Sequence, residues 1–347
     1  MRLLSLFLLP ILLFSEEMQT RTQARMGTFV HITLPIQHNK QISQSFMLIR
    51  EIERSLSSYD KEALVYKLNH DHKVFYDDCL IQAIQDSKQY YQDTHGYFDI
   101  TIGSISKSLY HFGEENSTVP CKEALQQAKR NIEAIEINST TITTDKNITI
   151  DLGGMGKGYA VDRVAEFLAE QNISQGIIAL SGDIRCLHVC TFELQSPYSE
   201  QTFASLKSKN PQLSISTSGT YRRYVNTQDN HHLINPKTAM QGRAFVSVSL
   251  FTHDDNAKID AYATALSVMP EEKAFAFLKR HKELGFVLVK NNGKIVHGNL
   301  EKFVSLTWKS YKEKATIPDK SKKSNTKSAS ESNLIHPDTT NPKMISR

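Results

Sequence analysis

The stretch Asp151-Leu-Gly-Gly-Met-Gly-Lys-Gly-Tyr-Ala-Val-Asp162 places four glycines within six positions. An extended segment, residues 147–151, precedes it, and a helical pattern follows from Gly158. Glycines let a backbone approach a ligand closely, and the free N–H groups of a helix start suit a phosphate, as does Lys157. Tyr159 breaks both the dinucleotide fingerprint and the P-loop pattern. The loop is therefore either a tight turn or an anion site.

The segments around this loop mix strands and helices without a regular strand–helix–strand alternation, which favours an α+β fold over a doubly wound sheet. Hydrophobic periodicity predicts the elements. Helices are expected at 40–58, 78–93, 121–131, 158–171, 258–268 and 271–281, and strands at 25–34, 176–181, near 187–195, 213–217 and 244–251. Residues 132–137 with 140–151, and residues 285–297, are expected to form hairpins, and 96–103 a short strand or loop.

The two ends of the chain differ from its body. Arg2 precedes an apolar run at residues 3–14, too short to cross a bilayer, which predicts a signal peptide or short membrane anchor over residues 1–17. Residues 18–309 form the expected domain. Residues 310–347 carry eight Lys/Arg and four Asp/Glu, so this segment, expected to be disordered, holds the whole net charge of +4. The neutral body argues against nucleic-acid binding.

The four cysteines lack the paired spacing of a zinc site. Cys186 and Cys190 are the nearest pair, but on one strand they would lie too far apart to bridge unless the chain turns between them. We therefore expect buried free thiols.

Three further groups of residues could carry chemistry. Asp260 and Thr264 share one helix face and offer oxygen ligands that suit Mg²⁺, or they are an ordinary exposed aspartate and a threonine bonded back into its helix. His232 is either a general base or a structural loop histidine. Tyr59 could stack on a flat ring, or simply cover the edge of the core.

Taken together, these segments resemble the ApbE family of FAD:protein FMN transferases over about residues 25–300. The stretch 151–162 resembles the family's D-L-G-G-I-A-K-G-Y-A-V-D signature at all but two positions. The other matching blocks follow in the family's order: Arg25 to Phe29, Ser57 to Tyr59 with Asn69, Gly96 to Gly103, Thr217 to Gly219, His232 to Thr238, and Asp260 to Thr264.

The resemblance implies an α+β, mixed-sheet, T-fold-like core with flanking helices. It also implies that FMN is transferred from FAD to a threonine of a target flavoprotein, with release of AMP. Mg²⁺ would be held by Asp260, Thr264 and the backbone carbonyl of Gly156, while His232 takes the proton of the threonine hydroxyl. The residues expected to bind FAD are Met26, Tyr59, Asp99, Ile100, Thr101, Gly153, Lys157, Tyr159 and Leu233.

Inside the signature, Gly156 stands where the family has alanine, and four positions outside it also depart from the family pattern: Ser104, Ser181, Asn235 and Ala239. None of them removes the expected base or metal ligands. An FAD pyrophosphatase that yields FMN and AMP, and a non-catalytic FAD-binding protein, are the alternative functions. The family expectation for the acceptor is a flavoprotein of a respiratory or electron-transport complex on the exported, periplasmic side of a bacterial membrane.

Overall fold

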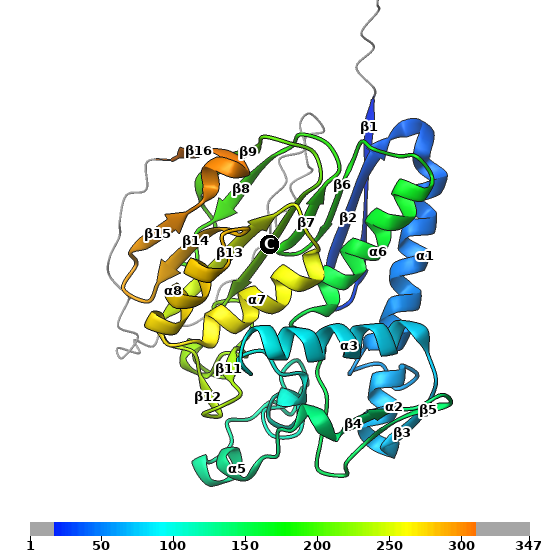
Figure 1. Ribbon diagram of the computed structural model, residues 1–347, viewed down its shortest axis with the longest axis vertical. Coiled ribbons are helices and arrows are strands. Elements are labelled where there is room, and N and C mark those ends of the chain that lie inside the picture. The colour runs from blue at the N-terminus through cyan, green and yellow to red at the C-terminus, as the bar shows by residue number, and fades with distance from the viewer. Residues whose placement is uncertain (1–16, 310–347) are drawn as a thin grey trace, which may run out of the picture.

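The computed structural model describes residues 17–309, and its framework is an eight-stranded sheet (Figure 1). The strand order is β1-β2-β6-β7-β10-β13-β14-β15, and every neighbouring pair is antiparallel. The strands are β1 (Met18–Arg25), β2 (Thr28–Pro35), β6 (Ile177–Leu180), β7 (Asp183–Cys186), β10 (Leu213–Gly219), β13 (Phe245–Thr252), β14 (Gly285–Lys290) and β15 (Ile295–Gly298). The predicted α+β class is confirmed.

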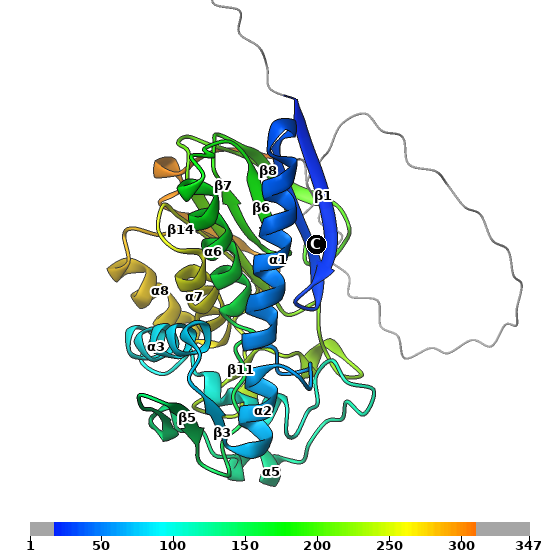
Figure 2. The same cartoon turned by 90° about the vertical axis from the view of Figure 1, so that its right-hand side faces the viewer.

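Helices cover one face of this sheet (Figures 1 and 2). They are α1 (Asn39–Leu56), α6 (Gly156–Glu170), α7 (Asn256–Val268) and α8 (Glu271–Arg280), as the sequence predicts to within two residues at either end. Helix α1 buries Ile42, Phe46, Ile49 and Ile52, the apolar positions at helical spacing. Helix α7 is buried on almost all sides, as expected for a helix enclosed between a sheet and other helices.

The opposite face of the sheet packs against a second, three-stranded sheet. Its strands are β8 (Thr191–Gln195), β9 (Thr202–Ser208) and β16 (Val304–Trp308), in the order β16-β9-β8. Phe192 and Leu206 of this sheet share an apolar cluster with Ile215 and Phe251 of the large sheet. The sequence pattern predicts β8 but not β9 or β16, so the predicted hairpin at 285–297 is followed by one more strand.

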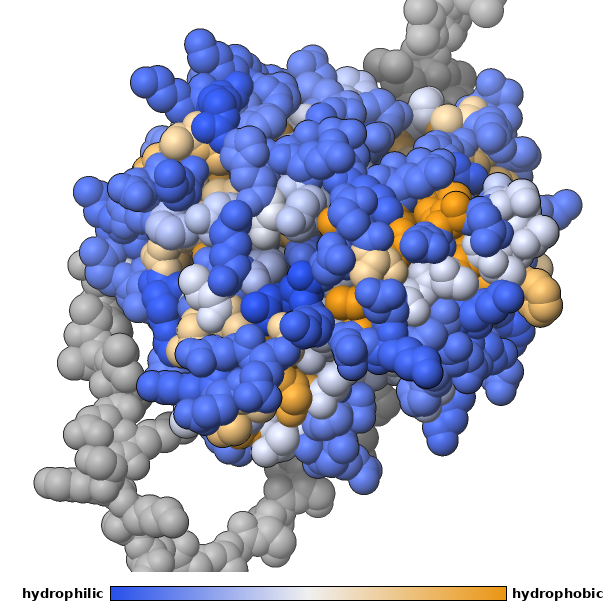
Figure 3. All heavy atoms as spheres, turned by 60° about the horizontal axis from the view of Figure 1, so that its bottom comes forward, coloured by the Kyte–Doolittle hydropathy of each residue, from blue (hydrophilic) through white to orange (hydrophobic). Residues whose placement is uncertain are grey.

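A lower lobe lies beneath the helices (Figure 2). It contains α2 (Leu64–Asp71), α3 (Asp78–Asp93), α4 (Gly103–Ser106), α5 (Lys122–Gln127), and a small sheet of β3 (Lys73–Phe75), β5 (Thr141–Thr144) and β4 (Ile135–Ile137). The strand alternative at 96–103 is wrong, because Ile100–Ile102 form a 3-10 turn that continues into α4. From below, apolar areas are small and separated by hydrophilic ones (Figure 3).

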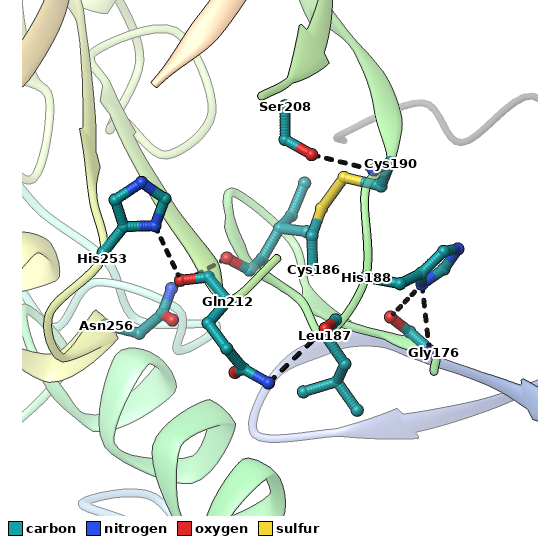
Figure 4. Close-up of a disulfide and its surroundings, with 10 residues drawn as sticks. Gly176, Cys186, Leu187, His188, Cys190, Ser208, Gln212, His253 and Asn256 are labelled. Carbon is teal, nitrogen blue, oxygen red and sulfur yellow. Dashed lines mark hydrogen bonds between the residues drawn. A yellow bond between two sulfur atoms is a disulfide. The ribbon is translucent and has the colours of Figure 1, made fainter. Parts of the chain in front are cut away.

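Cys186 and Cys190 form a disulfide, so the expectation of free thiols is wrong for this pair (Figure 4). The chain leaves β7 at Cys186 and turns before β8, which brings the two Cα atoms to 6.0 Å. Cys79 and Cys121 are free. The predicted signal segment, apart from Glu17, and the predicted tail lie outside the described residues. Between residues 17 and 309, no helix is long and apolar enough to cross a bilayer.

Helices α6 and α7 touch through a glycine, which gives a testable prediction. A Cβ at Gly158 would lie 2.4 Å from the backbone oxygen of Asn256, whereas a Cβ at Gly156 would meet only side-chain atoms at 3.8 Å or more. We expect Gly158→Ala to lower the free energy of unfolding by about 1–3 kcal/mol. Gly156→Ala is the matched control and should change it by less than about 1 kcal/mol. Equal effects in denaturant unfolding would refute this account of the helix contact.

Candidate active site

A cavity of about 480 Å³ opens at one end of the large sheet, a size typical of ligand sites. Three strand ends meet there because Val30 pairs with Leu180 and the Thr217 N–H donates to the carbonyl of Gly182. The β1–β2 turn, the β6–β7 turn and the end of β10 therefore lie together. The lower lobe and the segment after β10 close the cavity from the other sides.

The cavity brings together most of the residues that the sequence predicts for the site. Those that line it are Met26, Asp99, Gly153, Lys157, His232, Leu233, Asp260 and Thr264. Five predicted residues do not line it: Tyr59, Ile100, Thr101, Gly156 and Tyr159. The eight residues that line the cavity come from five separate segments of the chain, so the fold brings them together.

The residues outside the cavity support the ones inside it. Ile100 and Thr101 are fully buried; Thr101 donates from its N–H and its hydroxyl to the Asp99 carboxylate, at 2.8 and 2.7 Å. The Ile100 carbonyl accepts from Asp151 N at 2.7 Å, and Asn69 binds both backbone groups of Ile150. These contacts fix the start of the glycine-rich loop against the lower lobe.

The loop residue Lys157, predicted to hold a phosphate, instead pairs with two carboxylates. Its Nζ lies 2.8 Å from Asp183 Oδ2 and 3.1 Å from Asp260 Oδ2. The N–H of Gly158, in the first turn of α6, also points at Asp260 Oδ2, at 3.3 Å. The helix start therefore binds a carboxylate of the protein itself, which satisfies the groups that an anion would otherwise use.

The electrostatics of this cluster favour a cation. Burial, reinforced by the neighbouring Asp260, raises the pKa of Asp183 to about 7. Burial alone would lower the pKa of Lys157, but Asp183 and Asp260 outweigh it and hold that pKa above its usual range. With both carboxylates ionised, the three groups carry one net negative charge, which an added cation would neutralise.

Oxygen donors that suit Mg²⁺ lie around Thr264, one helical turn after Asp260 in α7. Thr264 Oγ1 lies 3.4 Å from the carbonyl oxygen of Gly154 and 3.5 Å from Ser218 Oγ. The Gly154 carbonyl therefore lies beside Thr264, whereas Gly156 does not line the cavity. Binding of the metal by the Gly156 carbonyl stays a prediction. No cluster of three or more His, Cys, Asp or Glu side chains suited to a metal occurs among the described residues. A cation here would rely on carboxylate, hydroxyl and carbonyl oxygens together, and these donors fit Mg²⁺.

His232 is held in one tautomer. Its Nδ1 lies 3.0 Å from the backbone oxygen of Arg223, which can only accept, so Nδ1 carries the proton and Nε2 keeps its lone pair. Desolvation, with the charge of Arg223, lowers the pKa of His232 to about 3, so the ring is neutral near pH 7. The adjacent His231 is 3% exposed, and both of its ring nitrogens bond to backbone, which makes it structural.

Tyr59, predicted to lie against the flavin, does not line the cavity but contacts residues that do. Lys107 Nζ lies 3.5 Å from the centroid of its ring. The hydroxyl donates to the Phe112 carbonyl at 2.8 Å and accepts from Arg223 at 3.2 Å. A Cβ at Gly113 would lie 3.0 Å from the hydroxyl oxygen, so this part of the chain also crowds the side chain. The side chain is nevertheless 43% exposed. Stacking of a flavin on Tyr59 therefore stays a prediction.

Asp162, the last residue of the signature, anchors the helix that carries Asp260. Its two oxygens accept from the N–H groups of Asn256 and Ala257, at the start of α7, at 2.9 and 2.8 Å. Arg185 donates to it at 2.6 Å. Burial raises the pKa of Asp162 to about 6 despite that partner. Asp162 is thus a structural residue that positions the Asp260 side of the cavity.

The four departures from the family pattern leave the local structure intact. Ser104 Oγ accepts from Thr149 N at 3.0 Å, and Asn235 Oδ1 accepts from Lys237 N at 2.9 Å. Ser181 and Ala239 have φ values of 57° and 59°, in the left-handed region that glycine adopts most easily. The left-handed backbone explains why the family pattern has glycine at both positions. In this chain, serine and alanine adopt that left-handed backbone in place of glycine.

Sequence reasoning missed several lining or supporting residues, chiefly Asp183, Lys107, Arg222, Arg223 and Ser218. One signal was available for Asp183, because a carboxylate next to the apolar strand 176–180 requires a buried partner. No comparable pattern marks Lys107 or Arg223.

The sheet, its helical cover and this cavity define an α+β protein with the fold of solved flavin transferases. A crystal structure of the ApbE protein of Thermotoga maritima has a TM-score of 0.74 and 22% identity, with 82% of this chain and 98% of that chain covered. The flavin transferase ApbE of Vibrio cholerae has a TM-score of 0.70 and 23% identity, with 83% and 99% covered.

The ApbE family model matches residues 26–288, and the chain belongs to the ApbE family. Among its curated relatives, an FAD:protein FMN transferase of Klebsiella pneumoniae is 26% identical over 283 residues, which cover 78% of this chain and 89% of that protein. An FAD:protein FMN transferase of Vibrio cholerae is 26% identical over 263 residues, covering 71% and 78%.

Proposed function

We propose that this chain is an FAD:protein FMN transferase that joins FMN, through its phosphate, to a threonine of a target flavoprotein. The observation that carries the proposal is that His232, Asp260 and Thr264 line the same cavity in a chain of the ApbE family. The curated relatives with this name extend over most of the chain, which supports the same activity here.

In the proposed reaction, the threonine oxygen attacks the phosphorus on the flavin side of the FAD pyrophosphate. A new P–O bond to the threonine forms, the P–O bond to the adenylate breaks, and AMP leaves. His232 Nε2, which has the free lone pair, takes the threonine proton. Bound by Asp260, the Thr264 hydroxyl and the Gly154 carbonyl, Mg²⁺ would neutralise the pyrophosphate and the departing AMP.

Two alternatives use the same cavity. An FAD pyrophosphatase would pass the phosphoryl group to water, and a binding protein would hold FAD unchanged.

The decisive assay combines the purified protein, FAD, Mg²⁺ and an acceptor domain that contains the threonine. We expect a flavin-fluorescent acceptor band on a denaturing gel, AMP in equal amount, and neither product in EDTA. Free FMN and AMP without a labelled band would establish hydrolysis, and bound FAD without products would establish a binder.

We propose, further, that residues 18–309 act outside the cytoplasm, on the periplasmic side, after export or anchoring by residues 1–17. The disulfide between Cys186 and Cys190 supports this, because such bonds persist in oxidising compartments. The acceptor would then be a flavoprotein of a respiratory or electron-transport complex that faces the same side.

A thiol-trapping experiment tests this location. In protein alkylated and denatured directly from cells, we expect two of the four cysteines, Cys79 and Cys121, to be modified, because Cys186 and Cys190 are bonded. Reduction before alkylation should give four modifications. Four modifications without reduction would contradict an oxidising compartment.

A further inference from the structure

Lys107 is a buried cation whose charge is only partly compensated within residues 17–309. It is 8% exposed and lines the cavity, and its nearest carboxylate oxygen, Asp151 Oδ2, is 3.6 Å away. That oxygen already accepts from Ser106 Oγ at 2.7 Å, and Asp151 Oδ1 accepts from Gly153 N at 2.9 Å. Within the described part of the chain, the ammonium makes no hydrogen bond. A buried charge is costly unless it is paired, so its donors suit a ligand oxygen in the cavity.

Tyr59 contacts both Lys107 and a second cation, Arg223, and so holds the two side chains near each other. The ring face of Tyr59 contacts the Lys107 ammonium at 3.5 Å, and its hydroxyl accepts from Arg223 Nη1 at 3.2 Å. The hydroxyl in turn donates to the Phe112 carbonyl, which fixes the ring. A cation on an aromatic face is stabilised without using its N–H donors. Tyr59 therefore positions two cations at the cavity wall and leaves most of their donors available.

The cavity has a positive end and a negative end, which we call its two poles. Lys107 and Arg223 form the positive pole, and Lys157, Asp183 and Asp260 form the negative pole. Lys107, Arg223 and Asp151 together carry one net positive charge. Lys157, Asp183 and Asp260 together carry one net negative charge when both carboxylates are ionised. A metal–pyrophosphate complex has the same separation of charge, so the two poles are complementary to its two ends.

We propose that Lys107 and Arg223, positioned by Tyr59, bind the phosphoryl group attached to the flavin. This inference rests on the proposed function and names the part of FAD that this pole binds. Arg223 also holds the catalytic base, since its backbone oxygen accepts from the N–H of His232 at 3.1 Å and binds the ring nitrogen. Arg223 and His232 both line the cavity, so a phosphoryl group bound by the Arg223 guanidinium would share the cavity with the base that deprotonates its attacker, which favours attack on the flavin side over the adenylate side.

Binding of FMN and riboflavin, followed by quenching of flavin fluorescence, tests the proposal without any transfer. The two ligands differ by one phosphate. We expect the wild-type protein to prefer FMN, and Lys107→Met to weaken FMN binding by roughly ten- to hundredfold while leaving riboflavin binding unchanged. Arg223→Gln should act in the same direction. Lys67→Met is the matched control, because Lys67 is half-exposed, pairs with Glu62 and lies outside the cavity.

Three results would overturn the inference. The first is a wild-type protein that binds FMN and riboflavin equally. The second is a Lys107→Met protein that weakens AMP binding but not FMN binding, which would place the adenylate phosphate at this pole. The third is an equal loss of FMN and riboflavin binding in a variant whose thermal unfolding matches that of the wild type. The first would leave FMN transfer itself untouched, so failure of this inference and failure of the proposed function are distinguishable.

Discussion

Replacing Asp260 by asparagine is expected to reduce FMN transfer by roughly a thousandfold. Asp260 is 3% exposed, binds the Lys157 ammonium, and lies one helical turn before Thr264. The amide keeps the shape but removes the charge that pairs Lys157 and would hold the cation. Initial rates of acceptor labelling over a range of Mg²⁺ concentrations measure the loss.

The control for this variant is Asp254→Asn, since Asp254 is exposed and its carboxylate pairs with Lys258 on the surface. It should retain the wild-type rate. Thermal unfolding of both variants separates lost chemistry from lost structure. A folded Asp260→Asn protein that labels the acceptor at the wild-type rate, with unchanged Mg²⁺ dependence, would remove Asp260 from the reaction.

Replacing His232 by alanine is expected to slow transfer by roughly 10²–10⁴-fold and to leave FAD affinity unchanged. The ring is neutral near pH 7, because its pKa is lowered to about 3, so its base form is always available there. The same shift predicts that kcat/KM does not fall near pH 6.5, where an ordinary histidine would become protonated.

His70→Ala is the control for this variant, since His70 is an exposed residue of α2. Transfer rates and FAD binding are measured on both proteins. Normal transfer by His232→Ala would show that another group takes the threonine proton. A loss of FAD affinity as large as the loss of rate would assign His232 to binding instead.

The sequence predicts a helix or strand best where the local residue pattern decides it without contacts to distant segments. Helix α3 begins and ends as expected, because Asp77 caps its first turn and its apolar residues recur at helical spacing. The sequence does not predict strand β1, because its residues, Met18–Arg25 (MQTRTQAR), have no apolar face. This segment is a strand because it pairs with β2. The β1–β2 turn has the usual glycine at its second position, Gly27, but at its first position Met26 takes a φ of 51° that Asn, Asp or Gly adopts more easily. Strand β16 depends on its pairing with β9, from which it is separated by 96 residues at the pair Val304 and Ser208.

The site divides in the same way. His232, Asp260 and Thr264 lie in short motifs and were reachable from the sequence. The pairing of Lys157 with Asp183 was not, because it depends on the packing of α6 against β7. The contacts of Tyr59 with Lys107 and Arg223 could not be predicted either, because the two cations come from distant segments. Motifs thus identify the residues that we propose to react, while the charges that surround them follow from the topology.

Mass spectrometry of the acceptor domain tests the central claim most directly. After incubation with this protein, FAD and Mg²⁺, we predict that the acceptor gains the mass of one FMN less one water, and that fragmentation places it on a threonine side chain. Replacement of that threonine by alanine should abolish the gain. An acceptor of unchanged mass, in a reaction where FAD has been consumed to FMN and AMP, would contradict transfer and identify a pyrophosphatase.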